Sequence, residues 1–147
     1  MSRRRTRVAN RIGVWLYRRL DGRLSSGRKD VTVLLITVPG RRTGLPRSTC
    51  VRFLGTPCGP VVWGTGSGAA HAPDWFRNLR AAELADVQIR RDRLRVRPRE
   101  LTGADRDAMW TDTILERAPE VARYARKAGR PIPVAVLEPL DGLGDRG

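Results

Sequence analysis

The apolar run VTVLLITV at residues 31–38 is the feature that most constrains how this chain can fold. Its β-branched and aliphatic side chains continue until Pro39 and Gly40, a pattern that predicts a buried strand ending in a turn. Two more segments of this kind follow at 46–54 and 60–65. Strands that succeed one another through short turns favour an antiparallel sheet over a parallel one.

The rest of the chain mixes short strands with short helices. Within residues 85–100 we expect two strands, and Leu94 and Val96 alternate there with arginines in the period of two that is typical of a strand. Helices are expected at 73–82, from residue 102 and at 119–129, with a last strand at 133–137. A chain of 147 residues suffices for one ordinary core, so we predict one α+β domain built on an antiparallel sheet or small barrel.

Positive charge is concentrated near the N-terminus. The chain carries 29 Lys and Arg residues against 15 Asp and Glu residues, a formal net charge of +14. We expect residues 1–7 to form a basic arm and residues 8–20 to form a basic amphipathic helix. This helix either caps the core domain or rests on an anionic membrane surface. We therefore divide the chain into an arm and helix at 1–30, a core domain at 31–140 and a flexible tail at 141–147.

The composition excludes several classes of protein. No apolar run approaches the roughly 18 residues that cross a membrane, and we expect no secretory signal. The only cysteines, Cys50 and Cys58, have no Cys or His cluster around them, which excludes a disulfide scaffold and a structural zinc site. This cysteine usage indicates the cytoplasm, with the inner face of the membrane as an alternative. The basic charge leaves a polyanionic ligand, a membrane or nucleic acid open as partners, although no nucleic-acid-binding motif occurs.

The basic turn GRRTGLPR at residues 40–47 is the strongest local signal for a binding site. Its two glycines allow a tight turn with exposed backbone N–H groups. Three arginines and one hydroxyl converge on it, namely Arg41, Arg42, Arg47 and Thr43. This set predicts a cradle for phosphate or carboxylate groups. An ordinary hairpin turn that is merely basic explains the glycines equally well.

A glycine-rich loop at residues 64–70 lies between a predicted strand and helix. Its spacing does not fit a dinucleotide fingerprint, because the helix begins only near Pro73 and no repeated βαβ units follow. Such a loop lets a flat ligand approach the backbone closely, and a flexible hairpin end is the alternative. Ser67, His71 and Asp74 are the residue types of a catalytic triad, but without a nucleophile elbow an exposed loop histidine is the simpler interpretation.

Five stretches spread along the chain carry a family resemblance. They are WLYRRLDG at 15–22, LLITVPGRRTGLPR at 34–47, PDWFRNLRA at 73–81, LTGADRDAMW at 101–110 and GRPIPV at 129–134. In order and spacing they resemble the deazaflavin-dependent nitroreductase family, small actinobacterial oxidoreductases that use coenzyme F420. The resemblance covers nearly the whole chain, from Trp15 to Pro139.

The resemblance implies a split β-barrel related to the FMN-binding fold at residues 31–140, with reduced coenzyme F420 as hydride donor and no metal. It places the anionic tail of the cofactor against the arginines of the basic turn. The ring would lie against the first strand and the glycine-rich loop, flanked by the helix at 73–82. The implied cofactor-binding residues are Leu35, Ile36, Thr37, Arg41, Arg42, Thr43, Gly44, Leu45, Pro46, Arg47, Thr65, Gly66, Ser67, Gly68, Trp75 and Asn78.

The chain departs from the family pattern at three places. Where the family often has Ser-Lys-Gly-Gly in the loop, this chain has Thr-Gly-Ser-Gly at 65–68, which removes a basic contact. Of several family tyrosines near the substrate only Tyr124 has a counterpart, so Tyr124 is the candidate catalytic residue on the substrate side. Arg52 stands where an aromatic residue can occur beside the pocket, which favours an anionic substrate.

These considerations predict an F420H2-dependent oxidoreductase that transfers a hydride to an electron-poor small molecule, such as a quinone or an enone. The first alternative is a split-barrel protein without catalytic activity that binds a fatty acid or another lipid. The second is a nucleic-acid-binding protein, favoured by the charge alone. The resemblance is also compatible with a homodimer.

Overall fold

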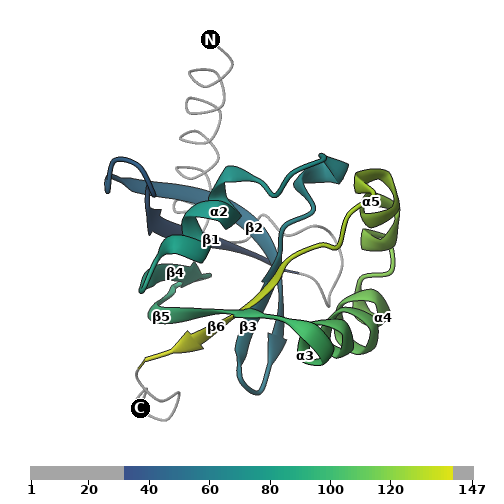
Figure 1. The fold of residues 1–147 in the computed structure, drawn as a ribbon. Coiled ribbons are helices and arrows are strands. Elements are labelled where there is room, and N and C mark those ends of the chain that lie inside the picture. Colours follow the sequence, from purple (N-terminus) through teal and green to yellow (C-terminus); the bar gives the residue numbers. More distant parts are fainter. Residues whose placement is uncertain (1–31, 141–147) are drawn as a thin grey trace.

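In the computed structural model, which describes residues 32–140, six antiparallel strands close into a barrel with helices packed around it (Figure 1). Around the barrel the strands follow the order β1-β2-β3-β6-β5-β4. Their bounds are β1 Thr32–Pro39, β2 Pro46–Thr56, β3 Gly59–Trp63, β4 Ala85–Ile89, β5 Asp92–Leu101 and β6 Val134–Pro139. The arm and helix predicted at 1–30 and the tail predicted at 141–147 lie outside the described residues.

Short helical segments connect the strands. They are η1 at Gly66–Gly68, α2 at Asp74–Ala81, α3 at Gly103–Ala108, the π-helical η2 at Met109–Ile114, α4 at Leu115–Arg117 and α5 at Val121–Ala128. The single helix predicted from residue 102 is therefore three consecutive pieces. Helix α2 packs against β1 and β5 and begins shortly after the glycine-rich loop, and α5 packs against η1 in the middle of that loop.

The alternation of side chains along β1 positions the barrel core. Leu34, Ile36 and Val38 are each at most 2% exposed and belong to the apolar cluster inside the barrel. Leu35 and Thr37 project from the opposite face, as successive residues of a strand must. Strand β2 pairs with β1 along its whole length, so the turn between them starts and ends in fixed register.

A second apolar cluster lies between the barrel and the helices. Leu54, Val61 and Val136 come from the barrel wall, and Ile114 and Val121 come from the helical segments that cover it. All five side chains are at most 1% exposed. Burial on this scale fixes α5 relative to the barrel, since each buried aliphatic side chain contributes about 1.5–3 kcal/mol.

The predicted α+β antiparallel barrel is confirmed, and the pair of strands expected within 85–100 is present as β4 and β5. They join at a tight turn in which Arg90 adopts φ +55°. The strand predicted at 60–65 ends earlier, at Trp63, where the chain leaves the barrel for the glycine-rich loop. Within residues 32–140 there is no helix of the length and apolar character needed to cross a membrane.

Candidate functional site

The turn between β1 and β2 is held by its own backbone. The N–H of Gly40 donates to the carbonyl of Leu45 at 2.8 Å, and the N–H of Gly44 donates to the carbonyl of Gly40 at 2.7 Å. The Thr43 hydroxyl oxygen accepts the N–H of Leu45 at 3.2 Å, so part of its hydrogen-bonding capacity serves the turn itself. Gly44 has φ +73°, a conformation that glycine adopts without strain.

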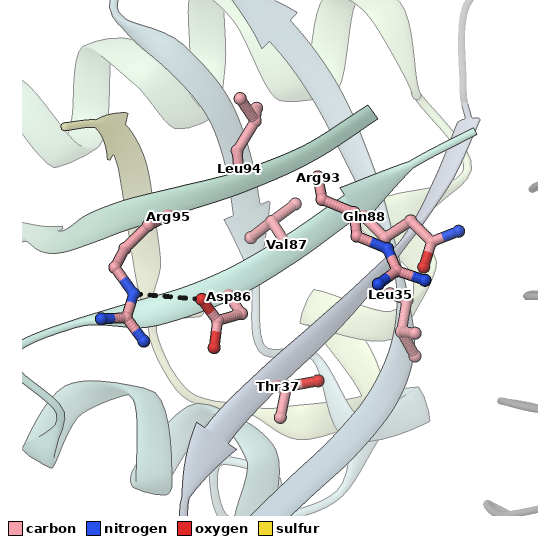
Figure 2. Close-up of a pocket in the computed structure, with 8 residues that line it drawn as sticks. All are labelled: Leu35, Thr37, Asp86, Val87, Gln88, Arg93, Leu94 and Arg95. Carbon is pink, nitrogen blue, oxygen red and sulfur yellow. Dashed lines mark hydrogen bonds and ion pairs between the residues drawn. The ribbon is translucent and has the colours of Figure 1, made fainter. Parts of the chain in front are cut away.

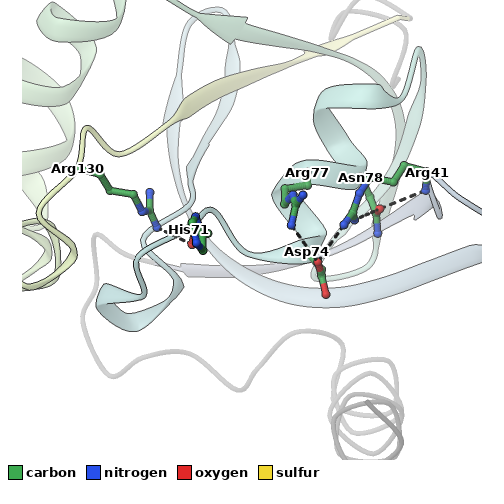
Figure 3. Close-up of polar contacts among 6 residues, drawn as sticks. All are labelled: Arg41, His71, Asp74, Arg77, Asn78 and Arg130. Carbon is green, nitrogen blue, oxygen red and sulfur yellow. Dashed lines mark hydrogen bonds and ion pairs between the residues drawn. The ribbon is translucent and has the colours of Figure 1, made fainter. Parts of the chain in front are cut away.

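Arg41 fastens this turn to helix α2 (Figure 3). Its Nη1 donates to Asn78 Oδ1 at 2.7 Å, its backbone N–H donates to the same oxygen at 3.2 Å, and its Nη2 contacts Asp74 Oδ1 at 3.2 Å. Asn78 is 8% exposed, whereas the Asp74 side chain is 78% exposed. The buried amide is therefore the firm half of the clamp, because an exposed ion pair adds little.

Arg42 and Arg47 have no ion pair with any residue in the described part of the chain. Arg42 is exposed, while Arg47 is half-buried and folds back over the turn. A Cβ atom added to Gly40 would lie 3.4 Å from Arg47 Nε, which places that guanidinium beside the backbone of the turn. The clamp by Arg41 thus leaves two other guanidinium groups available for an external anion.

The glycine-rich loop at residues 64–71 has an unusual backbone. Gly66, Ser67 and Gly68 have φ of +55°, +56° and +88°, so three consecutive residues are left-handed and one of them carries a side chain. The Nε and Nη2 atoms of Arg130 donate to four carbonyl oxygens of this loop. Sequence reasoning missed Arg130 as a site residue, although it noted the GRPIPV stretch that contains it.

The loop also meets a lysine from α5. A Cβ atom added to Gly68 would come within 2.7 Å of Lys127 Cδ and 3.0 Å of Lys127 Cβ, so the lysine stem lies directly on this glycine. Lys127 is exposed and has no ion pair within residues 32–140. The loop itself lacks a lysine, and α5 brings one to it from a different part of the chain.

Helix α2 carries the two remaining residues expected beside the ring. Trp75 is half-buried and packs edge-to-face on Phe76, with ring centroids 5.4 Å apart. Phe76 in turn supports the start of the glycine-rich loop, because a Cβ atom added to Gly64 would lie 3.2 Å from its ring. Asn78 uses its oxygen for Arg41, which leaves the amide nitrogen as its available donor. One short helix therefore touches both the basic turn and the loop.

The three residues predicted on β1 separate into two environments. The Ile36 side chain is inside the barrel, 1% exposed. Leu35 and Thr37 line a cleft of about 460 Å³ on the outer face of β1, β4 and β5, together with Gln88, Arg93 and the ion pair between Asp86 and Arg95 (Figure 2). No described hydrogen bond or ion pair joins this cleft to the cluster around Arg41.

Arg52 is occupied by structural contacts. Its Nη2 donates to Glu120 Oε1 at 2.6 Å and its guanidinium lies 5.8 Å from the centre of the Trp63 ring. It thereby links the barrel wall to the segment entering α5. Tyr124 lies on that helix, 38% exposed, and makes no described hydrogen bond. Its side chain is accessible to a ligand.

The other reactive residue types are not arranged for nucleophilic catalysis. No described hydrogen bond joins the side chains of Ser67, His71 and Asp74, and Asp74 Oδ1 instead faces Arg41 and Arg77. Burial raises the pKa of the Cys50 thiol, which keeps it protonated near neutral pH. Within residues 32–140 no cluster of His, Cys, Asp and Glu could hold a metal ion.

Comparison with known proteins now decides the family. The family model described as F420H(2)-dependent quinone reductase matches residues 9–139. The chain belongs to this family. An F420H(2)-dependent quinone reductase of Mycobacterium tuberculosis is 25% identical over 125 residues, covering 83% of this chain and 84% of the relative. The predicted membership among F420-dependent reductases is confirmed, although the matching family is named for quinones rather than for nitro compounds.

Solved structures agree with this assignment. A structure titled as an F420-H2 dependent reductase (FDR-A) is 27% identical, with a TM-score of 0.64 over 72% of this chain and 93% of that chain. A structure described as a domain-swapped dimer is 25% identical, with a TM-score of 0.65 over 86% of this chain and 98% of that chain. The barrel is therefore the split barrel of the F420-dependent reductases.

Reduced coenzyme F420 is the hydride donor of this family, and the chain is a deazaflavin-dependent reductase. The donor groups in the structure fit that cofactor. The anionic tail needs cationic donors, and Arg42 and Arg47 present two without a described partner. The flat ring must come close to the protein backbone, and the loop at 64–71 allows this because Gly66 and Gly68 have no side chains.

Proposed function

We propose that the chain transfers a hydride from reduced F420 to a quinone or to another electron-poor acceptor such as an enone. The family, the names of the relatives and the donor groups of the turn support this proposal. The observation that carries it is the clamp between Arg41 and α2, because it attaches the basic turn to α2 while Arg42 and Arg47 keep no described partner.

The cofactor tail would be bound by the basic turn at 40–47. Arg42 and Arg47 would contact its phosphate and carboxylate groups, since a guanidinium matches either group with two parallel hydrogen bonds. Arg41 would act one step behind them by keeping the turn against α2. The Thr43 hydroxyl and the backbone of Gly44, Leu45 and Pro46 would complete the contact surface.

The ring would lie between the glycine-rich loop and α2. Trp75 is held at one edge by Phe76, and the Asn78 amide nitrogen points away from the bond that fixes its oxygen. Leu35 and Thr37 line the separate cleft at β1, β4 and β5, so their proposed contribution would be to the acceptor side or to the far end of the cofactor. Tyr124 would be the substrate-side residue.

No nucleophile is required for this chemistry. When bound, reduced F420 supplies the hydride, and the protein contributes by holding donor and acceptor face to face in a site that excludes water. This division of labour agrees with the described residues, in which Ser67, His71 and Asp74 do not form a hydrogen-bonded triad. Donors such as the Tyr124 hydroxyl would stabilise charge that develops on the acceptor.

The proposal is tested by titrating the purified protein with F420 and following cofactor fluorescence. We expect binding by the wild type and, for the double variant Arg42→Ala with Arg47→Ala, affinity that is weaker by roughly tenfold or more, because charge-assisted hydrogen bonds contribute about 1.5–3 kcal/mol each. Arg97→Ala is the matched control, since Arg97 is exposed on β5 and has no described partner.

The outcomes distinguish the proposed function from the proposed binding of the cofactor tail by Arg42 and Arg47. Wild-type protein that does not bind F420 contradicts the function itself, and a fatty acid found by native mass spectrometry would then favour the lipid-binding alternative. Unchanged affinity in the double variant contradicts only the assignment of the tail to Arg42 and Arg47. Reduction of a soluble quinone analogue with F420H2, compared with an enone, identifies the class of acceptor.

Two properties of the whole chain stay proposals. The similar structure described as a domain-swapped dimer supports a homodimer, which light scattering of the full-length protein tests. Association of residues 8–20 with the inner face of the membrane rests on the sequence alone, and sedimentation with anionic liposomes tests it. Recovery of the protein in the supernatant would contradict that association.

A further inference from the structure

One guanidinium group binds the backbone of the glycine-rich loop at four carbonyl oxygens. Arg130 Nε donates to the carbonyl oxygen of Ala69 at 3.0 Å. Its Nη2 donates to the carbonyl oxygens of Gly64 and Thr65, both at 3.2 Å. The same atom donates to the carbonyl oxygen of His71 at 2.9 Å, which is the contact drawn in Figure 3. A single side chain therefore contacts the backbone at both ends of the loop.

Apart from Arg130, the loop is held by packing against Phe76 and Lys127 and by few backbone hydrogen bonds. Within it the backbone makes two bonds, from the N–H of Gly68 to the carbonyl of Thr65 and from the N–H of Ala69 to the carbonyl of Gly66. Ser67 has φ +56°, which is unfavourable for a residue with a side chain and persists only where its surroundings impose it. Four carbonyl dipoles that point toward one place repel one another unless a cation lies there.

Arg130 is itself held firmly in place. Helix α5 ends at Gly129, whose φ of +63° closes the helix and turns the chain toward β6. The segment that follows is bound by Arg106, whose Nε and Nη2 both donate to the carbonyl of Ile132 at 3.1 and 2.7 Å. The N–H of Gly64 also donates to the carbonyl of Pro133 at 3.0 Å. The start of the loop is therefore bonded directly to the same segment that carries Arg130.

The direction of the carbonyl groups fixes the direction of the amides. In a trans peptide the C=O of one residue and the N–H of the next lie in one plane and point in opposite directions, and the described chain has no cis peptide. Since the carbonyls of Gly64 and Thr65 face Arg130, the N–H groups of Thr65 and Gly66 face away from it. The arginine thus presents backbone donors on the opposite side of the loop.

We propose that Arg130 is a positioning residue of the reductase: through the carbonyls of residues 64–71 it holds the N–H groups of Thr65 and Gly66 toward the deazaflavin ring, whose carbonyl oxygens they would bind. This inference rests on the proposed placement of the ring at the loop. It assigns Arg130 no contact with the cofactor and no part in hydride transfer, so its removal is expected to act through the loop.

The test compares Arg130→Ala and Arg130→Lys with Arg126→Ala, because Arg126 is an exposed arginine near the end of α5 and has no described partner. We expect both Arg130 variants to bind F420 roughly tenfold more weakly or worse, because a lysine ammonium cannot span four carbonyls as a planar guanidinium does. Arg126→Ala is expected to bind like the wild type. Millimolar guanidinium ion, added to Arg130→Ala, is expected to restore part of the affinity.

A second measurement needs no cofactor. Amide signals of Thr65, Gly66 and Gly68 in ¹⁵N NMR spectra should shift or broaden in Arg130→Ala and Arg130→Lys, return toward their original positions with guanidinium ion, and stay unchanged in Arg126→Ala. The remaining barrel signals should keep their positions, which would show that both variants fold.

The results distinguish this inference from the proposed function. Loop amides that stay unchanged in a folded Arg130→Ala overturn the inference, whether or not F420 binds. Shifted amides with wild-type affinity for F420 also overturn it, because the loop would then not position the cofactor. Failure of the wild-type protein to bind F420 refutes the proposed function and the role inferred for Arg130 toward the ring.

Discussion

The basic turn at 40–47 and the glycine-rich loop at 64–71 are each fastened by one arginine, but the arginines use different partners. Arg41 binds the side chains of Asn78 and Asp74 in α2. Arg130 binds only backbone carbonyls. A clamp on side chains depends on the identity of its partners, whereas every residue offers a carbonyl. The second clamp therefore leaves the loop sequence free to vary, provided that its backbone path is kept.

This difference bears on the departure of residues 65–68 from the Ser-Lys-Gly-Gly pattern that resemblance to the family implies. Replacement of side chains there leaves the four carbonyls available to Arg130. A lysine also lies beside the loop in the structure, because the Lys127 stem of α5 lies on Gly68. The loop can thus differ in sequence from its relatives without losing either its support or a neighbouring positive charge.

The largest expected effect on stability distinguishes a glycine of the loop, Gly68, from a glycine of the basic turn, Gly44. Gly68→Ala combines a φ of +88° with a clash against Lys127, and should lower the free energy of unfolding by about 2–4 kcal/mol. Gly44→Ala has φ +73° but open space, and should cost about 1 kcal/mol of backbone strain. Urea unfolding followed by tryptophan fluorescence measures both. Equal losses would show that α5 does not confine the loop.

A smaller effect is expected when the side-chain clamp is cut at its buried end. Asn78→Ala removes the acceptor of two bonds from Arg41 and should destabilise the protein by about 1–3 kcal/mol. Asn78→Asp keeps the oxygen and should retain stability close to the wild type, while losing the amide donor proposed to face the ring. Reduced F420 affinity in Asn78→Asp with an unchanged unfolding midpoint would support that donor, and unchanged affinity would exclude it.

The smallest effect is expected at the exposed end of the same clamp. Asp74→Asn should change the free energy of unfolding by less than about 1 kcal/mol, and molar salt should abolish the difference from the wild type. Asp112→Asn serves as control, because Asp112 is exposed and has no described partner. A larger loss that persists in high salt would mean that Asp74, rather than Asn78, carries the clamp.

Much of the fold could be predicted because it follows local rules. The alternation around Leu94 and Val96, and the β-branched run at 31–38, determine which faces are buried, and both became strands of the predicted barrel. From residue 102 the sequence predicts one helix, whereas the structure has a π-helical turn at 109–114 between two α-helical pieces. No local sequence signal marks that turn. The side chains of Met109, Trp110 and Ile114 from that turn pack in or against the second apolar cluster, a contact between distant residues.

The candidate site could be predicted only in part, because it depends on contacts between distant residues. The basic turn was visible as a motif, but its attachment to Asn78 spans 37 residues and has no sequence signature. Arg130 is 59 residues or more from each carbonyl that it binds. The contacts of Arg52 with Glu120 and Trp63 could not be predicted from the sequence either, and its position beside the pocket stays a prediction. The assigned roles of the cofactor-binding residues stay predictions.

The closed ring of six strands also restricts how copies of this chain can associate. Among the described strands each has a neighbour on both sides, although β2 pairs with β3 only at Leu54–Thr56. Where a strand is paired on both sides, no edge is left for a further strand to join. At those places a second copy would have to contact the faces of the strands rather than extend the sheet.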